Sequence, residues 1–196
     1  MEEIKKTGSI EVICGPMFAG KSEEIIRRIR RIEYAKRKVI CFKPKIDDRY
    51  SKDEIVSHNQ NRKKSYVISS SDEIEPYLEK DTYAVVIDEV QFLDPGIVSV
   101  CSRLADRGIR VIVGGLDLDF RGEPFSIMPD LLARAESVTK LTAICVVCGE
   151  PATRTQRIVN GVPAFFEDPI VIVGAKETYE PRCRACHKVL KHKAAQ

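Results

Sequence analysis

Short apolar runs recur along this chain, and polar or glycine-containing segments follow them. The runs are rich in valine and isoleucine, which is typical of strands buried on both faces of a sheet. They predict strands at residues 10–14, 38–42, 65–68, 83–87, 109–113 and 137–141.

Between these runs, apolar residues stand three and four positions apart, as on one face of a helix. The spacing predicts helices at residues 21–35 and 129–135, and one that Asp94-Pro95-Gly96 opens and Gly108 ends. A short helix is also expected at 71–80, although it contains a proline. Because strands and helices alternate with short connections, we expect an α/β fold: a parallel sheet with helices on both faces.

The chain has 196 residues, enough for one full core and a smaller appendage. Its 32 basic and 29 acidic residues give a net charge of +3, too small to indicate a general nucleic-acid or membrane partner. No run approaches the ~18 apolar residues of a membrane span, and no apolar signal segment follows Met1. We therefore expect a cytoplasmic protein that binds neither membranes nor nucleic acid.

The segment between the first strand and the first helix carries a phosphate-binding pattern. It matches G-x-x-x-x-G-K-[ST] with Gly15, Pro16, Met17, Phe18, Ala19, Gly20, Lys21 and Ser22. Glycines let such a loop point its backbone N–H groups at phosphate oxygens, and the following helix adds its positive end. Lys21 would neutralise phosphate charge and Ser22 would ligate Mg2+. A chance match in a turn is disfavoured because a strand precedes the loop and a helix follows it.

Two adjacent carboxylates, Asp88 and Glu89, follow the buried run at 83–87. In phosphate-loop proteins such an acid holds the Mg2+ shell, so we assign Asp88 to magnesium beside Ser22. Glu89 is then free to act as a general base. After the strand at 38–42, Asp47 could support the metal and Arg49 could contact phosphate; a solvated loop is the alternative there.

An irregular segment at residues 114–125 carries Leu116, Phe120 and Phe125. Apolar side chains on a loop at the ligand end of a sheet suit a pocket wall for a flat organic group. A small hydrophobic cluster under the loop is the alternative.

Near Ala143 the sequence changes character, because two C-x-x-C pairs frame the remainder of the chain. Cys145 and Cys148 form one pair, and Cys183 and Cys186 form the other. In a cytosolic protein they indicate a structural zinc site with four thiolate ligands; a redox dithiol is the alternative. The long interval predicts a hairpin that turns at Asn160-Gly161. We therefore expect a kinase-type domain at 1–142 and a small zinc-ribbon-like lasso domain at 143–196.

Taken in order, the motifs resemble the type II thymidine kinase family over nearly the whole chain. They are residues 15–22, Lys43-Pro44-Lys45 with 47–50, Asp88-Glu89-Val90-Gln91-Phe92, Gly115-Leu116-Asp117 with Phe120 and Pro124-Phe125, and the cysteine pairs. The resemblance implies transfer of the ATP γ-phosphate to the 5′-hydroxyl of thymidine, with Mg2+ as cofactor and Glu89 as base. It also implies a homotetramer that thymidine triphosphate inhibits.

The resemblance also assigns binding residues. For ATP these are the loop 15–22, Arg49 and the run Asp88, Glu89, Val90 and Gln91. Around the thymine ring they are Met17, Phe92, Leu116, Phe120, Phe125, Thr155 and Tyr179, with Ile170 and Ile172 in a lasso loop over the base.

Two rival interpretations share some of these features. A phosphate-loop ATPase would use Glu89 to activate water, but it has no need of the Phe120 loop or the lasso. A nucleic-acid-binding module could use the zinc ribbon and the basic first helix, yet few aromatic residues accompany the ribbon arginines.

Overall fold

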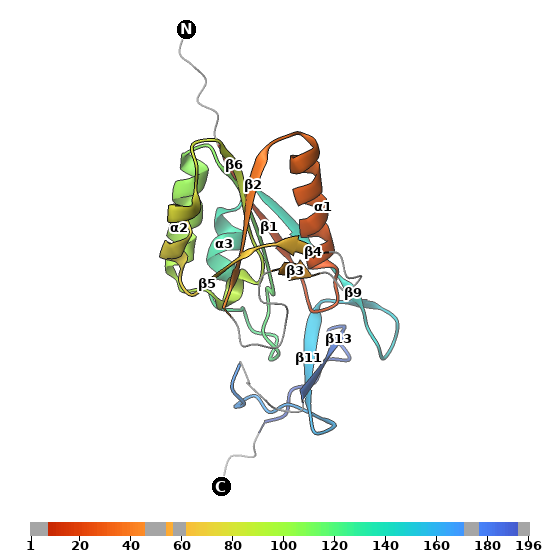
Figure 1. Ribbon diagram of the computed structural model, residues 1–196. Helices are drawn as coiled ribbons and strands as arrows, with labels where there is room; N and C mark the ends of the chain where they lie inside the picture. Colours follow the sequence, from red (N-terminus) through yellow and green to blue (C-terminus); the bar gives the residue numbers. More distant parts are fainter. Residues whose placement is uncertain (1–7, 46–53, 57–61, 171–176, 192–196) are drawn as a thin grey trace.

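The computed structural model describes residues 8–45, 54–56, 62–170 and 177–191, and a six-stranded sheet of parallel neighbours forms its centre. The strand order is β5-β2-β6-β7-β1-β8 (Figure 1). In chain order these strands are β1 (Ser9–Cys14), β2 (Lys38–Pro44), β5 (Tyr66–Ile68), β6 (Thr82–Ile87), β7 (Arg110–Gly115) and β8 (Ser137–Lys140). All six overlap predicted strands, and the predicted parallel sheet is confirmed.

Among the described residues, three α-helices cover the two faces of this sheet (Figure 1). They are α1 (Lys21–Tyr34), α2 (Gly96–Asp106) and α3 (Met128–Arg134). Helix α1 packs its isoleucines against one face, in a cluster that includes Ile13 and Ile112 of the sheet. Helices α2 and α3 pack on the other face, with Leu104 and Leu131 in the larger cluster. The three helices lie where the apolar spacing predicted them.

The helix predicted at 71–80 is wrong. The structure has two short 3-10 helices instead, η1 (Ser71–Glu73) and η2 (Glu75–Tyr77). Pro76 lacks the N–H that would continue an α-helix from η1, and it stands instead in the first turn of η2. Asp94 also fixes Ser71 by accepting its backbone N–H at 2.7 Å and its hydroxyl at 2.8 Å.

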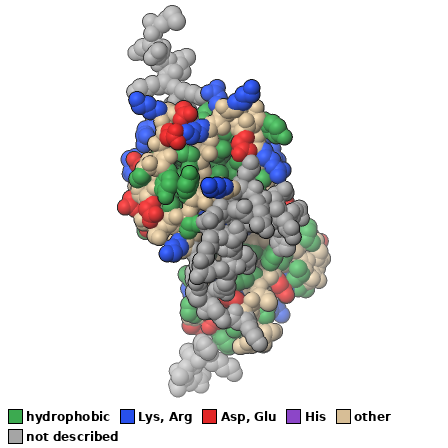
Figure 2. Space-filling model, viewed as in Figure 1, with side chains coloured by type: hydrophobic (Ala, Val, Ile, Leu, Met, Phe, Trp, Pro, Cys, Tyr) green, Lys and Arg blue, Asp and Glu red, His purple; other side chains and the backbone are tan. Residues whose placement is uncertain are grey.

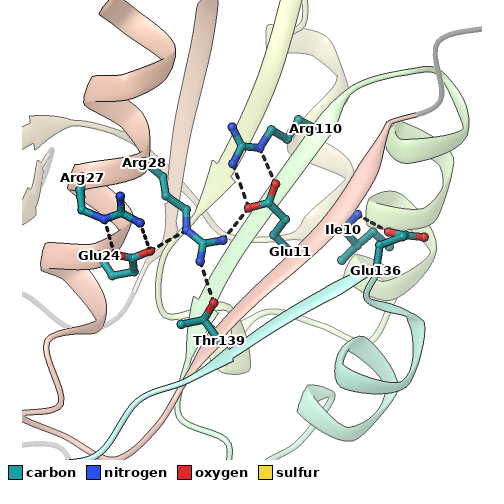
Figure 3. A network of polar contacts seen from close by, with 8 residues as sticks. All are labelled: Ile10, Glu11, Glu24, Arg27, Arg28, Arg110, Glu136 and Thr139. Atoms are coloured by element: carbon teal, nitrogen blue, oxygen red, sulfur yellow. Dashed lines mark hydrogen bonds and ion pairs between the residues drawn. The ribbon is translucent and has the colours of Figure 1, made fainter.

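The basic side chains of α1 are partly explained by a polar network at the sheet (Figure 3). Arg28 donates to Glu24 on its own helix, to Glu11 of β1 at 2.5 Å and to Thr139 of β8 at 2.8 Å. Glu11 is also paired with Arg110 of β7. The network joins α1 to three strands. Charged side chains of both signs are also mixed over the sheet-bearing part of the face in Figure 2.

A smaller β unit follows β8 and lies beyond one end of the sheet (Figure 1). Strands β9 (Ala143–Ile144) and β10 (Pro151–Ala152) form one short ribbon, and β12-β11-β13 form an antiparallel sheet. The latter are β11 (Arg154–Val159), β12 (Val162–Pro163) and β13 (Glu177–Arg182). Asn160 and Gly161 have φ values of 50° and 82°, as a two-residue hairpin turn requires, so the predicted hairpin is confirmed.

A further short pair, β3 (Glu54–Val56) with β4 (Arg62–Lys64), was not predicted. Across the described ranges, none of the helices has the length and apolar composition needed to cross a membrane.

Candidate active site

The phosphate-binding loop joins the end of β1 to the start of α1. Gly15 and Gly20 have φ values of 143° and 82°, and a Cβ at Gly15 would stand 2.4 Å from the Leu141 carbonyl oxygen. The loop shape therefore requires these glycines. Lys21 is buried and donates to the Pro16 carbonyl at 2.8 Å, which folds it back over the loop. Burial lowers the pKa of Lys21, against the opposing charges of Glu89 and Asp88.

Strand β7 lies between β1 and β6. The ends of β1 and β6, from which the loop and Asp88 emerge, are therefore two strand spacings or roughly 10 Å apart. The gap is bridged because β7 ends in Gly114-Gly115, which places no side chain between them. A Cβ at Gly114 would lie 2.4 Å from Ile25 Cδ1 and 3.3 Å from Asp88 Oδ1. Across this space Ser22 Oγ donates to Asp88 Oδ2 at 3.3 Å.

Asp88 is buried, and its Oδ1 accepts the Glu89 backbone N–H at 2.9 Å. Burial, with the neighbouring Glu89 charge, raises the pKa of Asp88 to about 7. A divalent cation beside it would hold this carboxylate ionised. The Ser22 hydroxyl and the Asp88 carboxylate are hard oxygen donors of the kind that Mg2+ prefers, so the pair fits a magnesium site.

Glu89 occupies the left-handed region, with φ 52° and ψ 39°. This conformation is uncommon for a residue with a side chain and is concentrated at functional sites. It starts the short helix η3 (Val90–Phe92), which brings Gln91 back to donate to Glu89 Oε2 at 2.5 Å. Gln91 was expected to contact ATP. Its described hydrogen bonds run to Glu89 and to the Leu116 N–H, and the ATP contact stays a prediction.

The aromatic residues predicted around a flat ligand fall into two groups. Phe92 and Phe125 meet edge to face with ring centroids 5.5 Å apart. Phe125 belongs to the main core, and Phe92 and Leu116 are partly buried and pack against it. Phe120 lies under the guanidinium of Arg157, with the Arg157 Cζ atom 4.0 Å from its ring centroid.

Tyr179 lies near the same guanidinium, with its ring centroid 5.6 Å from Arg157 Cζ. The loop 116–125 and the small β unit are therefore in contact through Arg157.

The phosphate-binding loop also touches the small β unit. Met17 donates its backbone N–H to Thr155 Oγ1 at 3.0 Å, so these two predicted residues are brought together. Ile170 is exposed, and its carbonyl accepts from Arg157. Asp47, Arg49 and Ile172 lie outside the described residues.

Three polar residues near the site were missed by the sequence reasoning. Arg157 is 2% exposed, donates to the carbonyls of residues 169 and 170, and lies beside Glu177. Asp119 caps the loop by accepting two backbone N–H groups. His187 contacts the Phe120 carbonyl through Nε2 at 2.9 Å. Isolated polar residues of this kind carry no local signal of such contacts.

The four cysteines of the C-x-x-C pairs converge. Their sulfur atoms all lie within 4.8 Å of one another, and Cys148 Sγ is 3.6 Å from Cys183 Sγ. Tetrahedral thiolates at the usual zinc distance stand roughly 3.8 Å apart. The cluster therefore fits a four-thiolate metal site.

The comparison with protein families agrees with this geometry. A family model described as thymidine kinase matches residues 8–187. The matched range includes the phosphate-binding loop, Asp88, Glu89 and all four cysteines, so the match spans both the sheet and the small β unit. On this match, the chain belongs to the thymidine kinase family.

Proposed function

We propose that this protein transfers the γ-phosphate of ATP to the 5′-hydroxyl of thymidine, giving thymidine monophosphate and ADP. The observation that carries the proposal is the convergence of Lys21, Ser22, Asp88 and Glu89 at one end of the sheet, with Ser22 Oγ 3.3 Å from Asp88. Membership of the thymidine kinase family supports the choice of acceptor.

The chain's residues divide the work of phosphoryl transfer. Backbone N–H groups of the loop and Lys21 hold the donor phosphates. Ser22 and Asp88 would hold Mg2+, which supplies charge neutralisation at the phosphate oxygens. Glu89 accepts the proton of the 5′-hydroxyl as that oxygen bonds to the γ-phosphorus and the bond to the ADP oxygen breaks. Such a base contributes ~10²–10⁴-fold to the rate.

The four-cysteine cluster is inferred to bind zinc in a structural role, because four thiolates leave no open coordination position for a substrate. We assign residues 1–142 to the kinase domain and 143–196 to the lasso domain. A homotetramer, inhibition by thymidine triphosphate and a cytoplasmic location are further expectations that rest on the family. Light scattering and inhibition kinetics test the first two.

The deciding experiment measures ADP release from Mg-ATP with no acceptor, thymidine, deoxyuridine, deoxycytidine or single-stranded DNA. We expect ADP only with thymidine or deoxyuridine, matched by nucleoside monophosphate. Equal ADP release without an acceptor would mean that Glu89 activates water, as in an ATPase. Release that depends on DNA would point to the nucleic-acid alternative.

A further inference from the structure

The side-chain amide of Gln91 is 2% exposed and joins two parts of the site. Its Oε1 accepts the Leu116 backbone N–H at 3.2 Å, and its Nε2 donates to Glu89 Oε2 at 2.5 Å. Chemistry fixes the orientation, because a backbone N–H needs the amide oxygen and a carboxylate needs the amide nitrogen. The amide thus links the proposed base to the start of the loop 116–125.

The backbone around Glu89 is built for this contact. The left-handed conformation of Glu89 opens the turn Val90–Phe92, which is closed by the Phe92 N–H donating to the Glu89 carbonyl at 3.2 Å. Residue 91 is thereby folded back toward the side chain of residue 89. A non-glycine residue in this region costs of order 1–3 kcal/mol, so the surrounding contacts must hold it.

Gly115 supplies an independent observation. A Cβ there would stand 2.4 Å from Gln91 Oε1, and 3.2 Å from Met128 Sδ. Gly115 does not have a left-handed backbone conformation. Glycine is therefore needed here because a larger residue would not fit. The space is occupied by the amide of Gln91.

We propose that Gln91 is a positioning residue, which fixes the Glu89 carboxylate in the orientation that accepts the hydroxyl proton. This inference rests on the proposed function, since it assumes that Glu89 is the base. Gln91 acts through Glu89 in this proposal, because the described hydrogen bonds of its buried amide run to Glu89 and to the Leu116 N–H. Misplacing a reacting group by ~1 Å can cost ~10²-fold in rate.

The first test compares Gln91→Met with Gln91→Glu. Gln91→Met removes the donor to Glu89, and Gln91→Glu replaces it with a carboxyl that shares a proton with Glu89 and so raises the pKa of the pair. In both variants kcat should fall by about 10- to 100-fold while Mg-ATP affinity changes by less than about twofold. Gln91→Glu keeps an acceptor for the Leu116 N–H, whereas Gln91→Met does not. We therefore expect the KM for thymidine to rise in Gln91→Met and to change little in Gln91→Glu. A loss of Mg-ATP affinity with unchanged kcat would overturn the proposal.

The second test is a double-mutant cycle with Glu89→Gln. If Gln91 acts only through Glu89, adding Gln91→Met to Glu89→Gln should lower the residual kcat by less than about twofold. Independent, multiplying losses would contradict the positioning role. Normal turnover by Glu89→Gln alone would instead refute the base assignment, which separates the two failures.

Gly115→Ala provides a variant that leaves Gln91 in place but displaces its amide. Gly115→Ala should lower kcat as much as Gln91→Met does, and the double variant should have the same kcat as Gln91→Met alone. Circular dichroism establishes that each variant is folded, and if Gln91→Met does not fold, Gln91→Glu and Gly115→Ala decide the question. Wild-type kcat in Gly115→Ala would overturn the argument from space.

Discussion

At the scale of single residues, the proposed chemistry depends most on Glu89. Glu89→Gln keeps the size of the side chain and leaves it within reach of Gln91, but the amide cannot accept the hydroxyl proton. We expect Mg-ATP affinity within about twofold of the wild type and a kcat lower by ~10²–10⁴-fold, measured by steady-state kinetics and nucleotide titration. A kcat near that of the wild type would remove Glu89 as the base.

Arg157 is the buried charge on which the small β unit depends. Substitution by methionine leaves the carbonyls of residues 169 and 170 without their donor and Glu177 without its cation. Removing one partner of a buried charge pair costs ~3–5 kcal/mol, so we expect a lower unfolding midpoint in Arg157→Met and a higher KM for thymidine. The exposed Arg184, which lies in the same unit, provides the matched control as Arg184→Met.

Residue-scale predictions could be made where a motif fixes the chemistry locally. The loop around Lys21 and the Asp88-Glu89 pair could be identified because their spacing is dictated by phosphate and magnesium. Gln91 and Arg157 could not be understood in this way, because their partners Leu116 and Ile170 are distant in sequence or are backbone groups. Only the folded chain brings these atoms together.

At the scale of elements, the Glu11 network holds α1 against the sheet. Glu11→Gln should lower the free energy of unfolding by ~1–3 kcal/mol at pH 7, measured by denaturant titration. The exposed Asp130 on α3 gives the control, and Asp130→Asn should cost less than ~0.5 kcal/mol.

The same network has a pH signature. Burial alone would raise the pKa of Glu11, but Arg110 and Arg28 lower it overall, and Arg27 lowers the pKa of Glu24 to about 2. A lowered carboxyl pKa adds stability above the ordinary value of 4.5 that is lost as the pH falls through the folded-state value. The difference in free energy of unfolding between wild type and Glu11→Gln should therefore shrink as the pH falls below 4.5. A difference that stayed constant would contradict the ion-pair account.

Element predictions were accurate where the apolar period was long and uninterrupted, as in α1 and the central strands. The helix predicted at 71–80 was wrong because the conformation of this segment depends on Asp94, which binds Ser71 from another part of the chain. A proline in a short polar segment does not indicate which alternative conformation will form.

At the scale of the whole molecule, the thiol cluster should decide whether the small β unit keeps its shape. Cys148→Ser removes one of four ligands, so metal analysis should show loss of zinc from the purified protein. Loss of zinc should raise the KM for thymidine before it affects the KM for ATP, because the small β unit carries Thr155 and Tyr179. Full zinc retention would contradict the assignment.

The hydrogen bond from the Met17 N–H to Thr155 Oγ1 has a thermodynamic consequence. It connects the donor loop to the unit proposed to cover the acceptor, so we expect occupancy of one site to alter the free energy of binding at the other. Such coupling is reciprocal: the factor by which thymidine tightens ATP binding is also the factor by which ATP tightens thymidine binding. In Thr155→Val both factors should fall toward one together. The affinity for each substrate should then depend less on whether the other is bound.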